Sequence, residues 1–172
     1  FRAVPSGFVP AQDKQYLVGF AQLPDAASLD RTEAVIRRMS DIAQSVPGVK
    51  SSVAFPGLSI HGFMNAPNSG IVFYTLEDFA KRDKGQTSGE IAAEVNKRLG
   101  AIQDAFIMVF PPPPVDGLGT IGGFKLYVED RGDNGLDALY GATQALLARA
   151  YETPGLAGLF TSFTINTPQL EA

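Results

Sequence analysis

The sequence contains no cysteine, no tryptophan and only one histidine in 172 residues. The lack of cysteine excludes disulfide bridges, thiolate metal ligands and a cysteine nucleophile. No apolar run approaches the ~18 residues that a membrane-spanning helix needs. The sequence begins at Phe1, without methionine or a signal peptide, so we expect that it has been cut from something larger.

Basic charge is also scarce, because 14 Lys and Arg residues face 18 Asp and Glu residues and the net charge is −4. The basic pairs at Arg37-Arg38, Lys81-Arg82 and Lys97-Arg98 lie among acidic neighbours. They predict solvated faces and not the basic stripe of a nucleic-acid-binding protein. Hydrophobic residues, by contrast, make up 45% of the chain, which is enough for a core in one domain or two small ones.

Hydrophobic periodicity predicts a mixed α+β fold for the first two thirds of the chain. Alternating patterns indicate strands and patterns of period 3.6 indicate helices; the strands are expected over Tyr16–Leu23, Val49–Phe55, Ile71–Leu76 and Ala105–Phe110, and the helices over Ser28–Val46 and Ser88–Ile102. The order strand, helix, strand, strand, helix, strand is that of a ferredoxin-like βαββαβ unit. We therefore expect a four-stranded antiparallel sheet with both helices on one face.

A second, partial βαβ module is expected after the glycine-rich segment Gly117–Gly123. Its strands are predicted over Phe124–Val128 and Leu156–Ile165, around a helix that contains Leu136 and Tyr151. The two modules match at an offset of 107, because Leu29-Asp30 recurs as Leu136-Asp137 and Pro47-Gly48 as Pro154-Gly155. This layout favours an internal duplication in which only half of the second copy is present. An isolated half-module leaves a sheet edge unpaired, so we expect its missing strands to come from elsewhere.

Motifs that resemble catalytic or cofactor sites do not have the context that their chemistry needs. Gly117–Gly122 spells G-x-G-x-x-G, but it follows prolines and precedes a predicted strand, so a hinge is favoured over a dinucleotide site. The carboxylates of Glu129, Asp130 and Asp133 lack the spacing of a calcium loop. His61 has no evident base or ligand set around it. We predict neither an enzyme nor a bound metal or cofactor.

An unusually apolar loop is predicted over Pro56–Ser69. Solvated loops avoid large apolar side chains, yet this one carries Leu58, Ile60, Phe63 and Met64. Glycines in and beside it, Gly57, Gly62 and Gly70, would allow its backbone to rearrange. Composition alone leaves two alternatives open: a packing element, or an apolar wall that binds varied ligands.

An ordered set of short motifs carries a family resemblance. It comprises Gly7–Asp13 (GFVPAQD), Gln22-Leu23-Pro24, Ser28–Thr32, Pro47-Gly48-Val49, Pro113-Pro114-Val115, Gly117–Thr120, Gly122-Gly123-Phe124 and Asn166–Leu170. Together these motifs resemble the second periplasmic half of RND efflux transporters of the hydrophobe/amphiphile class. Within this class, the sequence is most similar to MexF-like pumps. The resemblance covers essentially the whole chain.

The resemblance implies an inner-membrane pump of a Gram-negative cell that exports hydrophobic and amphiphilic drugs with the proton gradient. Residues 14–113 would be the periplasmic porter subdomain PC1, 114–123 a hinge, and 124–172 the first half of PC2. Residues 1–13 would lead from a membrane helix. Such pumps are homotrimers that work with a periplasmic adaptor (membrane fusion) protein and an outer-membrane channel.

The resemblance also implies substrate-binding positions, which fall into three groups. The deep pocket would be lined by Val53, Leu58, Ile60 and Phe73. The loop Pro56–Ser69 matches the family's switch loop, and it would contribute Phe63 and Met64. The outer cleft would contain Phe20, Gln22, Phe124, Leu126, Val128, Phe160 and Ser162. Two alternatives remain: a free-standing ferredoxin-like protein that binds small molecules, and a structural piece of the pump that contacts the adaptor without touching drug.

Overall fold

The computed structural model describes residues 12–60, 63–113, 126–156, 159–161, 163 and 165. The chain divides into two compact units, Phe1–Phe124 and Lys125–Ala172, and each is described by itself. The glycine-rich segment Gly117–Gly123 and the lone histidine His61 lie outside the described residues, as do the site candidates Phe124 and Ser162. No helix in the described part of the chain is long and apolar enough to cross a membrane.

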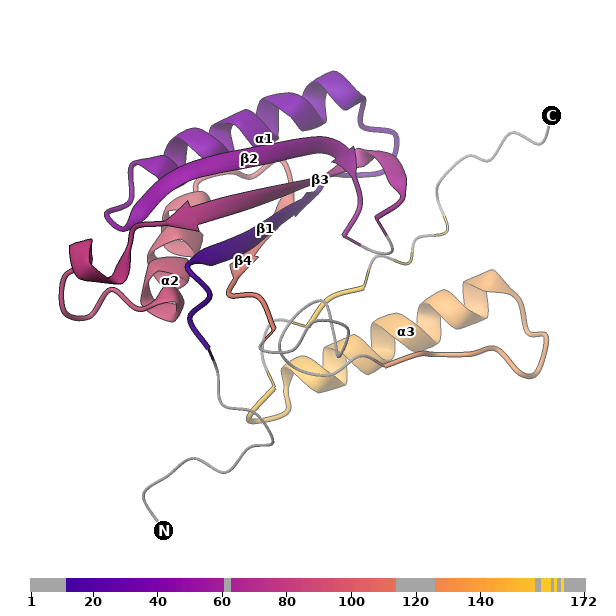
Figure 1. Ribbon diagram of the computed structural model, residues 1–172. Helices are drawn as coiled ribbons and strands as arrows, with labels where there is room; N and C mark the ends of the chain where they lie inside the picture. The colour runs from indigo at the N-terminus through magenta and orange to yellow at the C-terminus, as the bar shows by residue number, and fades with distance from the viewer. Residues whose placement is uncertain are drawn as a thin grey trace, which may run out of the picture. The chain divides into compact units, whose positions relative to one another are not determined.

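The first unit is a four-stranded antiparallel sheet with two helices on one face (Figure 1). Its strands, in the spatial order β2-β3-β1-β4, are β1 (Tyr16–Gln22), β2 (Val49–Leu58), β3 (Asn65–Leu76) and β4 (Phe106–Phe110). The helices are α1 (Leu29–Gln44) and α2 (Ser88–Leu99), and a short 3-10 turn, η1 (Phe79–Lys81), precedes α2. This arrangement confirms the ferredoxin-like unit expected from the sequence.

Both helices begin where the sequence supplies a capping side chain. The Ser28 hydroxyl accepts a hydrogen bond from the Arg31 amide at the start of α1. At the start of α2, Thr87 and Glu90 form a reciprocal capping box in which each side chain accepts from the other residue's amide. Gly48 ends the turn after α1 with φ of +96°, a left-handed conformation that favours glycine.

The core of this unit lies between the sheet and the two helices. It includes Leu17 and Tyr74 from the strands, Ile36 and Met39 from α1, and Val95 from α2, all at most 1% exposed. Core residues are spaced by two along β3 (Val72, Tyr74, Leu76) and by four along α1 (Val35, Met39, Ala43), as the two geometries require. Burial raises the pKa of the Tyr74 hydroxyl, so this group stays protonated inside the core.

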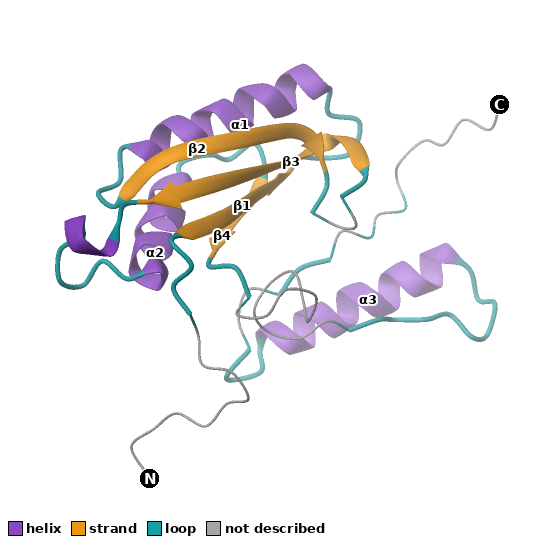
Figure 2. Cartoon of the chain, in the orientation of Figure 1, coloured by secondary structure: helices purple, strands orange, loops and turns teal. Residues whose placement is uncertain are grey.

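The predicted long loop Pro56–Ser69 is wrong in its extent. Strand β2 runs to Leu58 and β3 begins at Asn65, so most of the segment belongs to a β-hairpin (Figure 2). Leu58 pairs with Asn65, and the Ser59 amide donates to the Met64 carbonyl at 2.9 Å. The alternation of the strands continues through residues whose prolines and glycines suggested a loop.

Two of the glycines have structural roles and not the loop freedom expected of them. Gly57 has φ of +81° at an irregularity in the register between β2 and β3. Gly70 is an interior residue of β3, paired with Ala21 on one side and Pro56 on the other. A Cβ atom at Gly70 would lie 2.6 Å from the Ile36 side chain, so glycine allows α1 to pack closely against the sheet.

The second unit contains helix α3 (Leu136–Tyr151). This helix begins 107 positions after α1 begins and ends 107 positions after α1 ends, which matches the offset of the repeat. The repeated Pro-Gly pair is matched in conformation as well, with φ of +96° at Gly48 and +90° at Gly155.

The strands predicted on either side of α3 are wrong for the residues that the structure describes. Among residues 126–156, 159–161, 163 and 165, none is in a strand. A strand exists only where a second strand accepts its backbone hydrogen bonds, whereas a helix satisfies these groups within itself. The fold is therefore α+β, with a complete ferredoxin-like unit followed by a helix without an accompanying sheet in this part of the chain.

Candidate functional site

The face of the sheet opposite the helices is an apolar surface, which we call the open face. Leu17, Val72 and Val109 point into the helix-packed core, so their strand neighbours lie on the opposite side. These neighbours form the open face: Val18, Phe20, Gln22, Val53, Phe55, Ile71, Phe73, Phe106, Met108 and Phe110. All of them are uncharged and only Gln22 among these ten is polar, while Ser51, Ser69 and Thr75 lie toward the ends of the strands on the same side.

The strand register arranges the open face in rows across the sheet. One row joins Val53 on β2 to Phe73 on β3, which in turn lies beside Val18 on β1. The next row joins Phe55 to Ile71, and Ile71 lies beside Phe20. Two deep-pocket candidates, Val53 and Phe73, are therefore direct cross-strand partners.

Aromatic rings contact one another in two groups on the open face. Phe55 and Phe73 meet edge to face, with ring centroids 6.0 Å apart and an interplanar angle of 84°. Phe20 lies between two rings of β4, with centroids 5.9 Å from Phe106 and 6.2 Å from Phe110. Edge-to-face rings hold each other at defined angles, which gives this surface fixed shape as well as apolar area.

Exposure divides the candidates between a covered centre and an accessible edge. Phe20 and Ile60 are only 3% and 7% exposed, so their side chains are part of the packing. Val53 on the edge strand β2 is 54% exposed, and Phe63 and Met64 at the hairpin turn are 59% and 66% exposed. Leu58 and Phe73 lie between these extremes and are half-buried. The accessible parts of this apolar surface are therefore the edge formed by β2 with the hairpin turn and, on the opposite edge strand β4, Phe106, which is 43% exposed.

Gln22 does not present its amide to a ligand in this arrangement. Its Oε1 accepts a hydrogen bond from the Ser69 hydroxyl at 2.7 Å. Its Nε2 donates to the carbonyls of Leu23 and Asn68, each at 3.3 Å. Both ends of the side-chain amide are used within the protein.

The outer-cleft candidates of the second unit lie in extended or irregular backbone. Leu126 and Val128 are 61% and 37% exposed and belong to no strand. Phe160 is half-buried in a segment without regular structure. That these residues share a site with Phe20 and Gln22 of the first unit stays a prediction.

Sequence reasoning missed six of these ten residues of the open face, namely Val18, Phe55, Ile71, Phe106, Met108 and Phe110. A signal for them was present in the alternation of Val53 with Phe55 and of Phe106 with Met108 and Phe110. Period-two alternation in a sheet covered on one side only assigns every second residue to the other side. The interpretation of residues 56–69 as a loop obscured this pattern.

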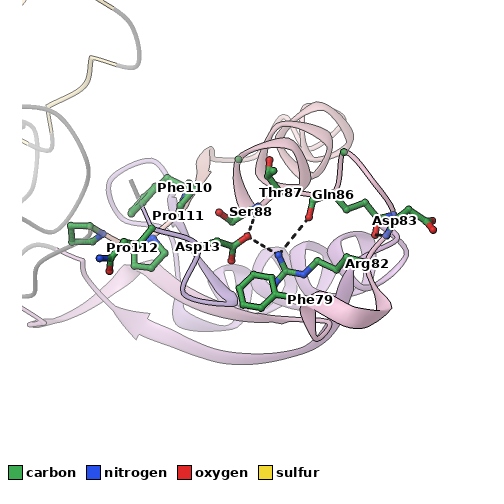
Figure 3. Close-up of a pocket in the computed structure, with 14 residues that line it drawn as sticks. Asp13, Phe79, Arg82, Asp83, Gln86, Thr87, Ser88, Phe110, Pro111 and Pro112 are labelled. Carbon is green, nitrogen blue, oxygen red and sulfur yellow. Dashed lines mark hydrogen bonds and ion pairs between the residues drawn. The ribbon is translucent and has the colours of Figure 1, made fainter. Parts of the chain in front are cut away.

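A pocket with a volume of about 800 Å³ lies beside α2 (Figure 3). Phe79, the first turn of α2 and the proline run that follows Phe110 line it. Arg82 crosses it with its side chain only 4% exposed; Nη1 lies 2.7 Å from Asp13 Oδ2 and Nε donates to the Glu77 carbonyl. The Phe79 ring lies over this guanidinium, 4.8 Å from its Cζ atom.

The Asp13 carboxylate fixes the segment before β1 to this part of the fold. Its Oδ2 also accepts the Ser88 amide at the start of α2, while Oδ1 accepts the Gln15 amide. Burial by itself raises the pKa of Asp13, but the hydrogen bonds from Arg82 and the two amides outweigh it, so the net pKa is lowered. The ion pair therefore has a structural role, because it holds the segment before β1 against Arg82 and the start of α2.

The chemistry available in the described part of the chain is that of apolar binding. No group of three or more His, Asp or Glu side chains in these residues is placed to hold a metal ion. The open face instead offers aromatic and aliphatic contacts at an exposed edge, which suits molecules with large apolar surfaces.

Comparison with known proteins places the chain in a family. The model of the AcrB/AcrD/AcrF family matches residues 1–172. The toluene efflux pump membrane transporter TtgE of Pseudomonas putida is 31% identical over 99% of the chain, which spans 16% of that protein. The multidrug export protein AcrF of Escherichia coli is 31% identical over 90% of the chain, which spans 15% of it. For the multidrug resistance protein MdtF of E. coli the values are 28%, 99% and 17%. The chain thus belongs to the AcrB/AcrD/AcrF family of RND efflux transporters.

Proposed function

We propose that this chain is the periplasmic substrate-binding and gating part of a proton-driven multidrug efflux transporter that exports hydrophobic and amphiphilic drugs. The observation that carries the proposal is the uncharged, aromatic open face with its exposed edge at Val53 and Phe55. A monomeric unit rarely exposes such an apolar edge without an interaction to serve. Membership of an efflux transporter family supplies the kind of interaction.

The role that we propose for this chain depends on which part of the transporter it represents. The chain spans about a sixth of the length of the curated relatives it matches. We propose that residues 14–113 are PC1 and 124–172 the first half of PC2, joined by a hinge. The charged residues that move protons lie in membrane segments elsewhere in the transporter. This portion binds and gates substrate, and it catalyses no reaction.

The partners follow from the same assignment. We place the chain on the periplasmic side of a Gram-negative inner membrane, within a homotrimer. A periplasmic adaptor protein and an outer-membrane channel complete the route, and hydrophobic or amphiphilic drugs are the ligands. A net charge of −4 gives no support to a nucleic-acid partner.

The binding physics is burial of apolar surface. A ligand that covers Val53, Phe55 and the ring of Phe73 removes their exposed area from water, which contributes about 25 cal/mol per Å². Phe63 and Met64 at the hairpin turn are exposed and can close over it, since methionine adapts to varied shapes. A ligand then favours whichever arrangement of the trimer gives it more buried contact.

Protection of single cysteines in the full-length transporter tests this proposal. Val53→Cys and Phe55→Cys, each in a cysteine-free background, place a thiol on the exposed edge. We expect a saturating hydrophobic ligand to slow maleimide labelling at both positions. Arg37→Cys, on the solvent side of α1, is the matched control and should label at the same rate with and without ligand.

Two results would separate the alternatives. Labelling at positions 53 and 55 that ligand does not change, but adaptor protein slows, would make this surface a structural contact of the pump. Equal protection at all three positions would indicate a global change and remove the open face as the ligand wall.

A further inference from the structure

The hairpin that carries Phe63 and Met64 separates from the rest of the sheet at one point. Pairing between β1 and β3 ends with Gln22 opposite Ser69. Beyond Ser69, the register of β3 has one further pair, Leu58 of β2 opposite Asn65, which follows an irregularity between Pro56 and Leu58. A two-stranded ribbon is marginally stable by itself, so its position depends on how its base is held.

A cluster of side-chain hydrogen bonds holds that base to β1. Ser69 donates its hydroxyl to Gln22 Oε1 at 2.7 Å, and Gln22 Nε2 donates to the Asn68 carbonyl. Asn68 Nδ2 returns a hydrogen bond to the Leu23 carbonyl at 3.4 Å, beside a backbone bond from the Leu23 amide to the Asn68 carbonyl.

The same base is also tied to the helix layer. The hydroxyl of Thr32, in the first turn of α1, lies 2.6 Å from the Pro67 carbonyl and 3.3 Å from the Ser28 carbonyl. Thr32 is fully buried and Ser69 is 4% exposed, so water does not replace these partners when one is lost. Buried hydrogen bonds of this kind fix a single geometry because each unpaired group carries a desolvation penalty.

We propose that Gln22, Thr32 and Ser69 form a latch that sets the position of the β2–β3 hairpin. Gln22 is then a positioning residue, which acts on ligands through the hairpin and not by contact. The resemblance implied a direct substrate contact for Gln22, but its amide is already engaged at both ends. That the hairpin gates substrate rests on the proposed function; that the latch holds the hairpin does not.

Hydrogen exchange in the ligand-free, full-length transporter tests the latch without any drug. Gln22→Met keeps the length of the side chain and removes its hydrogen bonds. We expect amides of residues 56–68 to exchange about tenfold faster, the scale of losing one buried hydrogen bond, while α2 is unchanged. Gln44→Met is the matched control, because it removes an exposed hydrogen bond from Gln44 to Ser52 on the same sheet.

Ser69→Ala and Thr32→Val are second variants that remove single hydroxyls and should loosen the same segment if Gln22→Met does not fold. Faster exchange confined to residues 56–68 in the latch variants supports the proposal. Three results overturn it: faster exchange in every segment, an equal effect from Gln44→Met, or unchanged exchange together with weaker binding of a hydrophobic dye. The last result would make Gln22 a ligand contact.

Discussion

Helices α1 and α3 are two copies of one sequence pattern in different surroundings. Each has 16 residues, and the repeated Leu-Asp and Pro-Gly pairs mark its ends. Helix α1 buries Thr32, Val35, Ile36, Met39 and Ala43, whereas Thr143 is the single buried residue of α3. The repeated sequence pattern is therefore enough to form a helix, but packing against a sheet decides how much that helix contributes to the stability of the fold.

The largest expected difference is at the core position of each helix. Met39 is 0% exposed, and Leu146, which lies 107 positions later, is 41% exposed. Met39→Ala should lower the free energy of unfolding by about 4 kcal/mol, since it leaves a cavity. Leu146→Ala should cost less than about 1 kcal/mol. Urea denaturation followed by circular dichroism measures both, and equal costs would mean that α3 is packed as α1 is.

The buried ion pair between Asp13 and Arg82 in the first unit gives the next largest effect. Asp13→Asn leaves the buried Arg82 guanidinium without a charged partner and should cost about 3 kcal/mol. Asp130 in the second unit accepts from its own loop, through the amides of Gly132 and Gly135 and the side-chain amide of Asn134. Asp130→Asn should leave the unfolding midpoint unchanged; a shift as large as that of Asp13→Asn would contradict the contrast between the units.

The Asp13 pair also predicts how stability depends on pH. Its folded pKa is lowered below the ordinary value by hydrogen bonds that outweigh burial. The stabilisation is therefore complete above the unfolded pKa of about 4 and is lost as pH falls through the lower folded value. Below pH ~4 the wild-type protein should lose stability more steeply than Asp13→Asn. Parallel curves of unfolding free energy against pH would exclude Asp13 as the responsible group.

The repeated glycines offer a smaller and closely matched test. Gly48 and Gly155 both have positive φ, so alanine at either position should cost about 1 kcal/mol in backbone strain. A Cβ at Gly48 would also lie 2.7 Å from Ile91 Cδ1, whereas at Gly155 it meets nothing within 4 Å. We expect Gly48→Ala to cost about 1 kcal/mol more than Gly155→Ala, because Ile91 must move. Equal losses in thermal unfolding would show that Ile91 adjusts freely.

Local patterns predicted the first unit well because each element carries its own signal. Ser28 and Thr87 mark helix starts, and Gly48 marks a helix end. The strands flanking α3 were not found in the described residues because strand formation depends on a neighbour, which a pattern does not supply. For the same reason, Pro56–Ser69 was interpreted as a loop, although its two arms belong to β2 and β3 and meet where Leu58 pairs with Asn65.

The candidate site was predictable in part. Val53 and Phe73 came from the family resemblance, and the register places them side by side. Gln22 illustrates what a one-dimensional match cannot show, because its partners Ser69 and Asn68 are more than forty residues away. A position that resembles a ligand contact can therefore be a structural hydrogen-bonding group.

Dye binding to the full-length transporter tests the central claim, which is that the open face contacts the ligand. Phe73→Ala removes a ring from that face, while Phe79→Ala removes an exposed ring that lies over Arg82 and serves as the control. Fluorescence titration with a hydrophobic dye should give a Kd that rises about tenfold or more for Phe73→Ala, the scale of one buried aromatic contact, and stays constant for Phe79→Ala. Equal Kd values for wild type and Phe73→Ala would contradict the assignment of the open face as the ligand wall.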